Sequence, residues 1–343
     1  MDYMNGKNRE IWIDNTKVIA CILVVLGHFF QSMTKSGIVE SNDILLWFDK
    51  TIYYFHVPLF FICSGYLYQQ CSKVNSPEDW SKNIFKKIIA LGIPYFTFSF
   101  ATWLLKVLFS GGVNTKPEGL LYTFFVFPSS PYWYLFALFL IFVITPTFRN
   151  KKTALIGLVI AIVFKLLNIF GVGSNIEAKA VSYILSNEIW FVIGMEMCIF
   201  DIVNILKSKK TLISAVLTGV IFVIASIFEY RFGTNIFGIG FILGCMACFC
   251  VIAVIVFIFK DNRQNGFFGF MAKYTMPIFL MHTLFAATFR SVLLKVGINS
   301  AVVHIVLGIS ISFAGPVIAA WVMEKSKWLE IFIYPNKFIG KKR

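Results

Sequence analysis

A lysine and a histidine stand eleven residues apart in the first apolar segment of the chain. Lys17 and His28 belong to the run WIDNTKVIACILVVLGH. Eleven residues of α-helix rise about 16 Å and return to nearly the same face, so the two side chains share it. Ionisable side chains inside a membrane are costly and mark functional sites by default. An imidazole there can take a proton from a hydroxyl group or accept an acyl group itself. The alternative is a packed histidine that only donates a hydrogen bond. That alternative is favoured for an isolated histidine, and the alignment with Lys17 brings the functional interpretation level with it.

Other ionisable side chains are expected to support this pair. Asp14 lies three residues before Lys17, on nearly the same helical stripe, and is expected to orient it. His56 lies near the outer end of the second apolar segment, at a depth similar to that of His28, and His282 lies partway across the ninth. We expect His56 and His282 to bind the second substrate or to orient His28.

A carboxyl group and two lysines complete the set of candidate residues. Glu188 lies near the middle of the sixth apolar segment, where it is expected to line a polar cavity. Lys86 and Lys87 precede the third segment. Most such clusters only fix the orientation of a membrane helix, but a phosphate-rich ligand that enters from the cytoplasm also needs cations of this kind.

The elements that must position these side chains are membrane helices. The chain has 343 residues, of which 58% are hydrophobic and only 14% charged, whereas a soluble domain keeps about a quarter of its residues charged. The chain contains repeated apolar runs of about 20 residues, which is the length that crosses a bilayer. We predict an all-α integral membrane protein, a bundle of about ten transmembrane helices at residues 15–33, 51–69, 88–109, 132–148, 153–170, 181–200, 211–228, 236–259, 274–293 and 301–323.

Basic residues predict how this bundle is oriented. If the N-terminus is cytoplasmic, every cytoplasmic segment carries at least three Lys or Arg residues, and no external segment carries more than two. The positive-inside rule therefore predicts both termini on the cytoplasmic side. We expect residues 1–343 to form a single membrane domain, with no appended soluble domain.

Composition and spacing also argue against two kinds of partner. The net charge of +14 is carried between the apolar runs, without a basic stripe interleaved with aromatic residues, so no nucleic-acid binding is expected. Cys245, Cys248 and Cys250 lie in one apolar run without an accompanying His or carboxylate. Because a structural zinc ion takes four ligands, we expect these cysteines to act as small buried apolar side chains and predict no metal site.

The motifs resemble those of the acyltransferase family 3 membrane proteins over essentially the whole sequence. That family shows a basic residue, ten intervening residues and a histidine in its first helix, matched here by Lys17 and His28. FHVPLFFICSGYL in the second segment resembles the subgroup that includes fucose 4-O-acetylase-like enzymes. Weaker matches are KKIIALGIPY, WYLFALF, FVIGM and YTMPIFLMH. The basic position is often Arg in the family, and Lys17 offers a point charge in place of a planar fork.

The resemblance implies an O-acetyltransferase of a bacterial inner (plasma) membrane, with membrane lipids around it. It would move an acetyl group from acetyl-CoA, a co-substrate rather than a bound cofactor, to a hydroxyl of a cell-surface or lipid-linked saccharide such as an O-antigen or exopolysaccharide unit. His28 would be the essential residue, as general base or transient acyl carrier. Lys17, with Lys86 and Lys87, would hold the phosphates of CoA.

Two alternatives come from other classes of protein. A secondary transporter or glycan flippase also has many helices with buried His and Glu residues. Such transporters often show inverted repeats with matched broken helices, and residues 1–170 do not correspond in this way to residues 171–343. A non-catalytic membrane scaffold has no need for the Lys17–His28 pair. A transporter would move labelled substrate without consuming a thioester, whereas an acyltransferase would release free CoA.

Overall fold

The computed structural model describes residues 10–109, 118–233 and 236–338, and within these ranges the chain forms helices joined by loops, without a strand. Some basic residues behind the predicted orientation lie outside the described residues: Lys7, Arg9, Lys116, Lys341, Lys342 and Arg343. The elements are, in chain order, α1 (Ile11–Lys35), α2 (Asp43–Ile52), α3 (His56–Cys71), α4 (Pro77–Lys87), η1 (Ile88–Gly92), α5 (Ile93–Leu108), η3 (Tyr122–Val126), α6 (Trp133–Ile144), α7 (Lys151–Ile169), α8 (Ala180–Ile199), α9 (Ile202–Leu206), α10 (Lys209–Phe232), α11 (Ile239–Ile258), α12 (Gly266–Lys295), α13 (Ala301–Met323), α14 (Lys327–Ile333) and η4 (Pro335–Phe338).

Seven helical stretches of the described residues are long and apolar enough to cross a membrane. They are Ile11–Lys35, Pro77–Leu108, Lys151–Ile169, Lys209–Phe232, Ile239–Ile258, Gly266–Lys295 and Ala301–Met323. The chain is therefore an all-α, multi-pass membrane protein. The three other predicted segments coincide with α3, α6 and α8, of which α3 has 16 residues and α6 has 12. Both are shorter than the usual spanning helix, so ten crossings stay a prediction.

The second predicted segment is divided into two helices. The side chain of Asn42 accepts a hydrogen bond from the Leu45 amide and so caps α2, which ends at Ile52. The chain then breaks its helical course before α3 begins at His56, which places Pro58 in the first turn of α3. A first-turn proline costs little because its missing N–H would have had no partner inside the helix.

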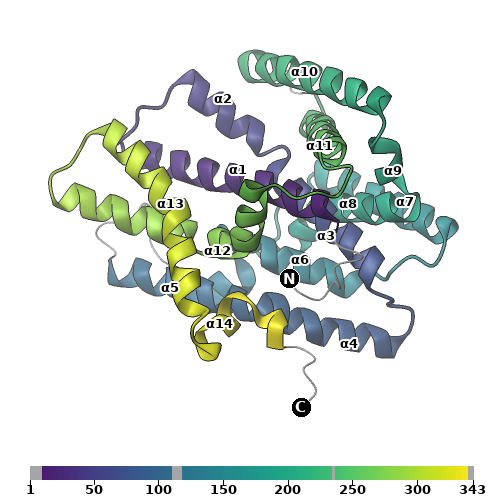
Figure 1. Cartoon of the computed structure of the whole chain (residues 1–343), viewed down its shortest axis with the longest axis horizontal. Coiled ribbons are helices and arrows are strands. Elements are labelled where there is room, and N and C mark those ends of the chain that lie inside the picture. The colour runs from purple at the N-terminus through teal and green to yellow at the C-terminus, as the bar shows by residue number, and fades with distance from the viewer. Residues whose placement is uncertain (1–9, 110–117, 234–235, 339–343) are drawn as a thin grey trace.

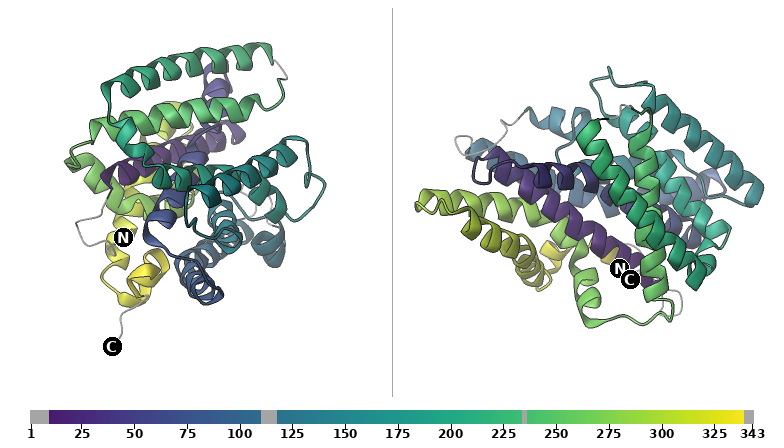
Figure 2. Two further views of the ribbon diagram at one scale, coloured as in Figure 1. Left: turned by 90° about the vertical axis from the view of Figure 1, so that its right-hand side faces the viewer. Right: turned by 90° about the horizontal axis from the view of Figure 1, so that it is seen from above.

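Helix α1 lies in the middle of the bundle, in contact with several other helices (Figure 1). It packs against α12, α3 and α11, while α12 continues onto α13 and α3 packs on α8, which in turn packs on α7. Figure 2 shows α10 and α11 lying side by side at one edge of the molecule. The candidate residues on α1, α3, α8 and α12 thus belong to helices that touch one another near the centre.

The contact between α3 and α8 depends on two glycines. A Cβ on Gly65 would lie 1.9 Å from the carbonyl oxygen of Phe191, and a Cβ on Gly194 would lie 2.0 Å from that of Ile62. Only glycine lets the two backbones approach this closely, as is common where membrane helices pack. The close contact fixes α3, and with it His56, against the neighbouring helix.

Helix α12 passes through a proline before it reaches His282. Pro277 has no N–H, so the carbonyl of Lys273 loses the partner that a regular helix would give it. The hydroxyl of Tyr334, just after α14, donates to that carbonyl at 3.1 Å. The C-terminal part of the chain therefore supports α12 at the point where its own hydrogen-bond ladder is interrupted.

Candidate active site

Three of the four histidines of the chain gather between α1, α3 and α12. The rings of His28 and His282 stack, with centroids 5.5 Å apart and planes inclined by 27°. Tyr53, in the break between α2 and α3, lies edge-on to both His28 and His56, at centroid distances of 6.5 and 4.6 Å. The structure thus brings together residues that are more than 200 positions apart in the sequence.

Backbone carbonyls fix the tautomers of two of these rings. Nδ1 of His56 lies 2.6 Å from the Ile52 carbonyl oxygen, and Nδ1 of His282 lies 2.9 Å from that of Ile278. A carbonyl oxygen only accepts, so both Nδ1 atoms carry the hydrogen and both Nε2 atoms keep a free lone pair. Nε2 of His282 is buried and has no hydrogen-bond partner among the described residues. Each ring is thus prepared to accept a proton or a hydroxyl hydrogen bond.

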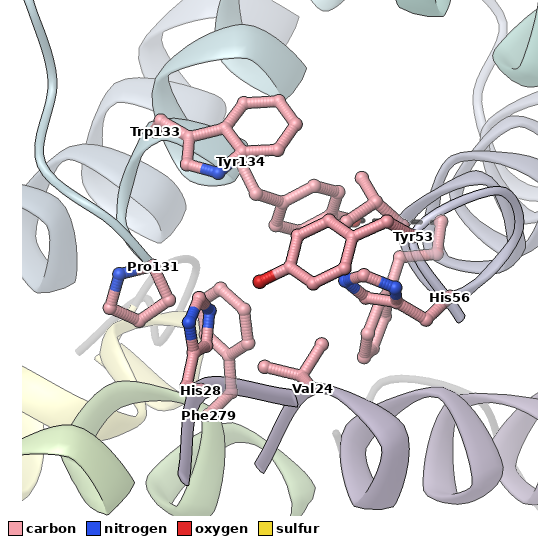
Figure 3. Close-up of a pocket in the computed structure, with 10 residues that line it drawn as sticks. Val24, His28, Tyr53, His56, Pro131, Trp133, Tyr134 and Phe279 are labelled. Atoms are coloured by element: carbon pink, nitrogen blue, oxygen red, sulfur yellow. Dashed lines mark hydrogen bonds between the residues drawn. The ribbon is translucent and has the colours of Figure 1, made fainter. Parts of the chain in front are cut away.

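His28 faces a small pocket, shown in Figure 3. The pocket has a volume of about 20 Å³, room for roughly one water or hydroxyl group, and its walls include His28, Tyr53, His56, Pro131, Trp133 and Phe279. The hydroxyl of Tyr53 points toward His28 in this view. Ser130 Oγ lies 3.3 Å from Nε2 of His28 and can form a hydrogen bond with it. The arrangement surrounds one small group with nitrogen lone pairs and hydroxyls.

Several of these neighbours were not among the residues predicted from the sequence. Tyr53 and Ser130 lie in breaks between helices, and Phe279 lies one turn before His282 on α12. Trp133 and Phe279 had a signal, because they lie in the motifs WYLFALF and YTMPIFLMH that carry part of the family resemblance. A pattern based on helical periodicity does not report on residues that loops bring to the site.

Lysines form a second cluster at the other end of α1. Lys17 and Lys87 are both half-buried and lie within range of each other's charge. Lys87 also lies 3.8 Å from the centroid of the Phe142 ring, a cation–π contact that holds it in place. Lys86 is exposed on the neighbouring position of α4, and Asp14 is half-buried one turn before Lys17. The structure therefore pairs Lys17 with Lys87 more closely than the sequence alone indicates.

The hydrogen bond of the Glu188 carboxylate goes to neither the lysine cluster nor the histidine pocket. Its Oε1 accepts a hydrogen bond of 2.7 Å from Thr145 Oγ1, while Oε2 is buried without a hydrogen-bond partner among the described residues. It is not one of the residues that line the histidine pocket. Its neighbour Asn187 instead lines a second cavity, described below.

Closely packed apolar residues separate the two clusters. On α1, Cys21, Val24 and Val25 are at most 3% exposed, and they belong to the same hydrophobic core as the fully buried Phe61 and Cys63 of α3. The lysine cluster and the histidine pocket thus lie at opposite ends of α1, with a layer of buried apolar side chains between them.

Outside the bundle core, α1 is tied to α2 by an amide and a carboxylate. Nε2 of Gln31 donates to both carboxylate oxygens of Asp49, at 2.9 and 3.0 Å. Burial raises the pKa of Asp49, although the bond from Gln31 and the charge of Lys35 act in the opposite direction. This link holds the segment that leads into Tyr53 against the helix that carries His28.

No group of three His, Cys, Asp or Glu side chains in the described ranges is placed to hold a metal ion.

A family profile described as an acyltransferase domain matches residues 10–321. The chain belongs to the acyltransferase 3 family. Both the lysine cluster and the histidine pocket lie within the matched residues.

Two relatives of this acyltransferase are similar over part of their length. Nodulation protein NolL of Sinorhizobium fredii (strain NBRC 101917 / NGR234) is 45% identical over 62 residues, which are 18% of this chain and 16% of that protein. Nodulation protein NolL of Mesorhizobium japonicum (strain LMG 29417 / CECT 9101 / MAFF 303099) is 27% identical over 137 residues, 40% of this chain and 35% of that protein. The chain thus aligns with about a third or less of these relatives. No solved structure matches it.

Proposed function

We propose that this acyltransferase moves an acetyl group from cytoplasmic acetyl-CoA to a hydroxyl of a cell-surface or lipid-linked saccharide, in the inner membrane of a bacterium. The observation that carries the proposal is the convergence of His28 and His56 on one small pocket, with the ring of His282 stacked on that of His28. Histidine is the side chain that most often moves protons in catalysis, and acyl transfer to a hydroxyl requires one proton to move. Family membership supports the class of reaction.

The lysine cluster supports binding of the acyl donor at the opposite end of α1. Two half-buried cations at Lys17 and Lys87 suit a phosphate-rich group, and exposed Lys86 adds to the attraction. The rise of about 16 Å from Lys17 to His28 is comparable to the reach of a pantetheine arm. The phosphates of CoA can therefore stay at the lysines while the thioester approaches His28. Asp14 is placed one turn from Lys17 to orient it.

Two routes balance the protons and bonds of the transfer. In the direct route, Nε2 of His28 takes the proton of the sugar hydroxyl while the oxygen attacks the thioester carbonyl, and CoA leaves with that proton when the C–S bond breaks. In the two-step route, Nε2 attacks the thioester carbonyl, the C–S bond breaks, and the CoA thiolate leaves with the Nδ1 proton of the acylated ring. The acyl-imidazole then passes the acetyl group to the hydroxyl, whose proton ends on the imidazole. His56 and His282 can accept hydrogen bonds from the sugar in either route.

The deciding experiment measures ester formation and thioester consumption together. A strain that lacks the protein would receive wild type, His28→Ala or His304→Gln, with membrane levels matched, and the O-acetyl esters of its surface glycan would be measured. His304 is the matched control because it is the remaining histidine, and it lies on α13 with its Nε2 bonded to the Ile298 carbonyl. We expect wild type and His304→Gln to restore acetylation and His28→Ala to fail.

Membranes from the same strains would be tested for release of free CoA from acetyl-CoA. Full acetylation by His28→Ala would remove His28 from the mechanism. Movement of a labelled glycan across the membrane without CoA release would favour the transporter or flippase. Transfer without a transported product supports the acyltransferase.

A further inference from the structure

A second, larger cavity adjoins the histidine pocket. It has a volume of about 410 Å³, within the range of roughly 300–1,000 Å³ typical of small-molecule sites. The two spaces share Tyr53, Val57 and Trp133 in their walls. The pocket beside His28 has room for about one hydroxyl group, whereas the adjoining cavity has room for a ring. A substrate in the larger cavity can therefore present a single group to His28.

The larger cavity is walled by aromatic side chains. Trp133 stands opposite His28 across the small pocket (Figure 3) and continues into the larger one. Trp190 and Phe241 form another wall, with ring centroids 5.0 Å apart. Aromatic faces bury the apolar C–H face of a sugar ring while leaving its hydroxyl groups at the edge free to bond. The wall composition thus suits a pyranose.

One cation lies in this cavity. Nζ of Lys165 donates to the Ser186 carbonyl oxygen at 3.2 Å and lies 5.4 Å from the centroid of the Phe241 ring. No ion pair joins Lys165 to a carboxylate among the described residues. A charge at membrane depth is costly unless something neutralises it, and charged residues there usually face a substrate path. The position of Lys165 therefore calls for a negatively charged partner from outside the chain.

A hydrogen-bond acceptor lies on the same wall. The amide nitrogen of Asn187 is engaged with the Tyr183 carbonyl at 2.8 Å and Ser186 Oγ at 2.7 Å. Its carbonyl oxygen is therefore the atom of that side chain left to receive a ligand hydroxyl. Lys165 lies near the end of α7 that the distribution of basic residues assigns to the outer side, and Asn187 lies about two turns from the corresponding end of α8.

We propose that this cavity binds the saccharide acceptor and selects one that carries an anionic group. The sugar ring packs between Trp133 and Trp190, one hydroxyl reaches past Tyr53 to His28, and the anionic group pairs with Lys165. This inference rests on the proposed function and specifies its acceptor. The anion can be a carboxylate on the ring or a phosphate at the reducing end, and both present the same chemistry to Lys165.

The test compares acceptors with the purified wild-type protein in lipid nanodiscs. Acetyl-CoA would be supplied with a nitrophenyl glucuronide, the matching neutral glucoside, or a glucosyl phosphate, and transfer to each would be measured. We expect at least a tenfold higher kcat/KM for an anionic acceptor than for the neutral one. The glucuronide and the glucosyl phosphate distinguish a ring carboxylate from a reducing-end phosphate. Equal rates for all three acceptors would overturn the proposal.

Variants assign the preference to this lysine. Lys165→Gln should lose the preference for the anionic acceptor while retaining transfer to the neutral one, and Lys165→Arg should keep it. Lys179→Gln is the control, because Lys179 lies over the Phe127 ring on the same side and does not line the cavity. An unchanged preference in Lys165→Gln would overturn the role of Lys165. If the wild-type protein consumes acetyl-CoA at the same rate with charged and neutral acceptors, the anion preference is wrong and the proposed function stands. If it consumes no acetyl-CoA with any acceptor, the proposed function itself is wrong.

Stabilisation by the ligand gives a readout that does not need a variant to fold. Glucuronate should raise the melting temperature of the wild-type protein in nanodiscs more than glucose does at the same concentration and ionic strength. Equal shifts with the two sugars would count against an anion site.

Discussion

The imidazole rings of His28 and His282 stack with their centroids 5.5 Å apart. Two positive charges at this separation inside an apolar bundle would repel each other strongly, so the pair holds at most one extra proton at a time. The Nδ1 atom of His282 is bonded to backbone carbonyls, which leaves its Nε2 as the atom that can share a proton with a neighbour. Under the proposed function, the pair would therefore act as one proton-accepting unit.

Removing the nitrogens of His282 should slow the reaction without emptying the site. His282→Phe keeps a ring against His28 but cannot accept a proton, and we expect kcat to fall roughly a hundredfold, the lower end of what a proton-transferring side chain contributes. The KM for acetyl-CoA should change little. Steady-state kinetics over a pH series would measure both, since the acidic limb of the profile should also move. A variant with wild-type kcat and an unchanged pH profile would show that only the ring shape matters.

The two half-buried lysines should matter more than the exposed one for donor binding. Lys17→Gln and Lys87→Gln should each raise the KM for acetyl-CoA about tenfold, because each removes a charge-assisted bond to phosphate. Lys86→Gln, on the adjacent exposed position, should change it by about twofold or less. The comparison needs low and high salt, since screening should shrink the differences. Equal effects of all three variants would indicate a diffuse field rather than a binding site.

Substituting the contact glycines should destabilise the protein. Gly65→Ala or Gly194→Ala would place a methyl group about 2 Å from a backbone oxygen of the facing helix, so α3 and α8 must separate. We expect a cost of about 3 kcal/mol or more, at the upper end of overpacking. Thermal unfolding in detergent measures it, with Gly266→Ala as the control because nothing lies within 4 Å of its added Cβ. Wild-type melting of Gly194→Ala would mean that the helices do not touch there.

The Asp49–Gln31 link predicts a stability that depends on pH. The pKa of Asp49 is raised in the folded protein, so folding favours its protonated form and that contribution is lost as the pH rises through the folded pKa. Asp49→Asn keeps a bond to Gln31 without a charge to bury, and it should melt higher than wild type at neutral pH. The difference should vanish below pH 4. Asp43→Asn, at an exposed residue paired with Arg231, serves as the comparison and should melt no higher than wild type.

The sequence predicts the helices well because membrane helices follow from local composition. Each predicted segment overlaps a helix, and α4, η1 and α5 form one continuous stretch that begins at Pro77, before the predicted start at residue 88. Ser76 caps this stretch by accepting from the Asp79 amide, a short polar signal that a hydropathy pattern overlooks. The break at Tyr53 was also missed, since residues 51–69 are apolar on both sides of it.

The candidate site is only partly a local property. Spacing along one helix placed Lys17 and His28 on a common face, but nothing in α1 states that His282 would stack on His28 or that Lys87 would approach Lys17. Those relationships depend on which helices become neighbours, a tertiary choice made by contacts such as the glycine pair of α3 and α8. Lys165 gives no signal of its own in the sequence, because a lone lysine near a helix end usually serves as an anchor.

The apolar layer between the lysines and the histidines has an electrical consequence. Cys21, Val24 and Val25 are at most 3% exposed, and buried side chains of this kind offer protons and ions no hydrogen-bonded route along this part of α1. An acyl group is uncharged, so its movement past this layer would carry no charge from one side to the other. A cell can therefore hold many copies of the protein and keep its membrane potential, and patch recordings from membranes rich in it should show no added conductance.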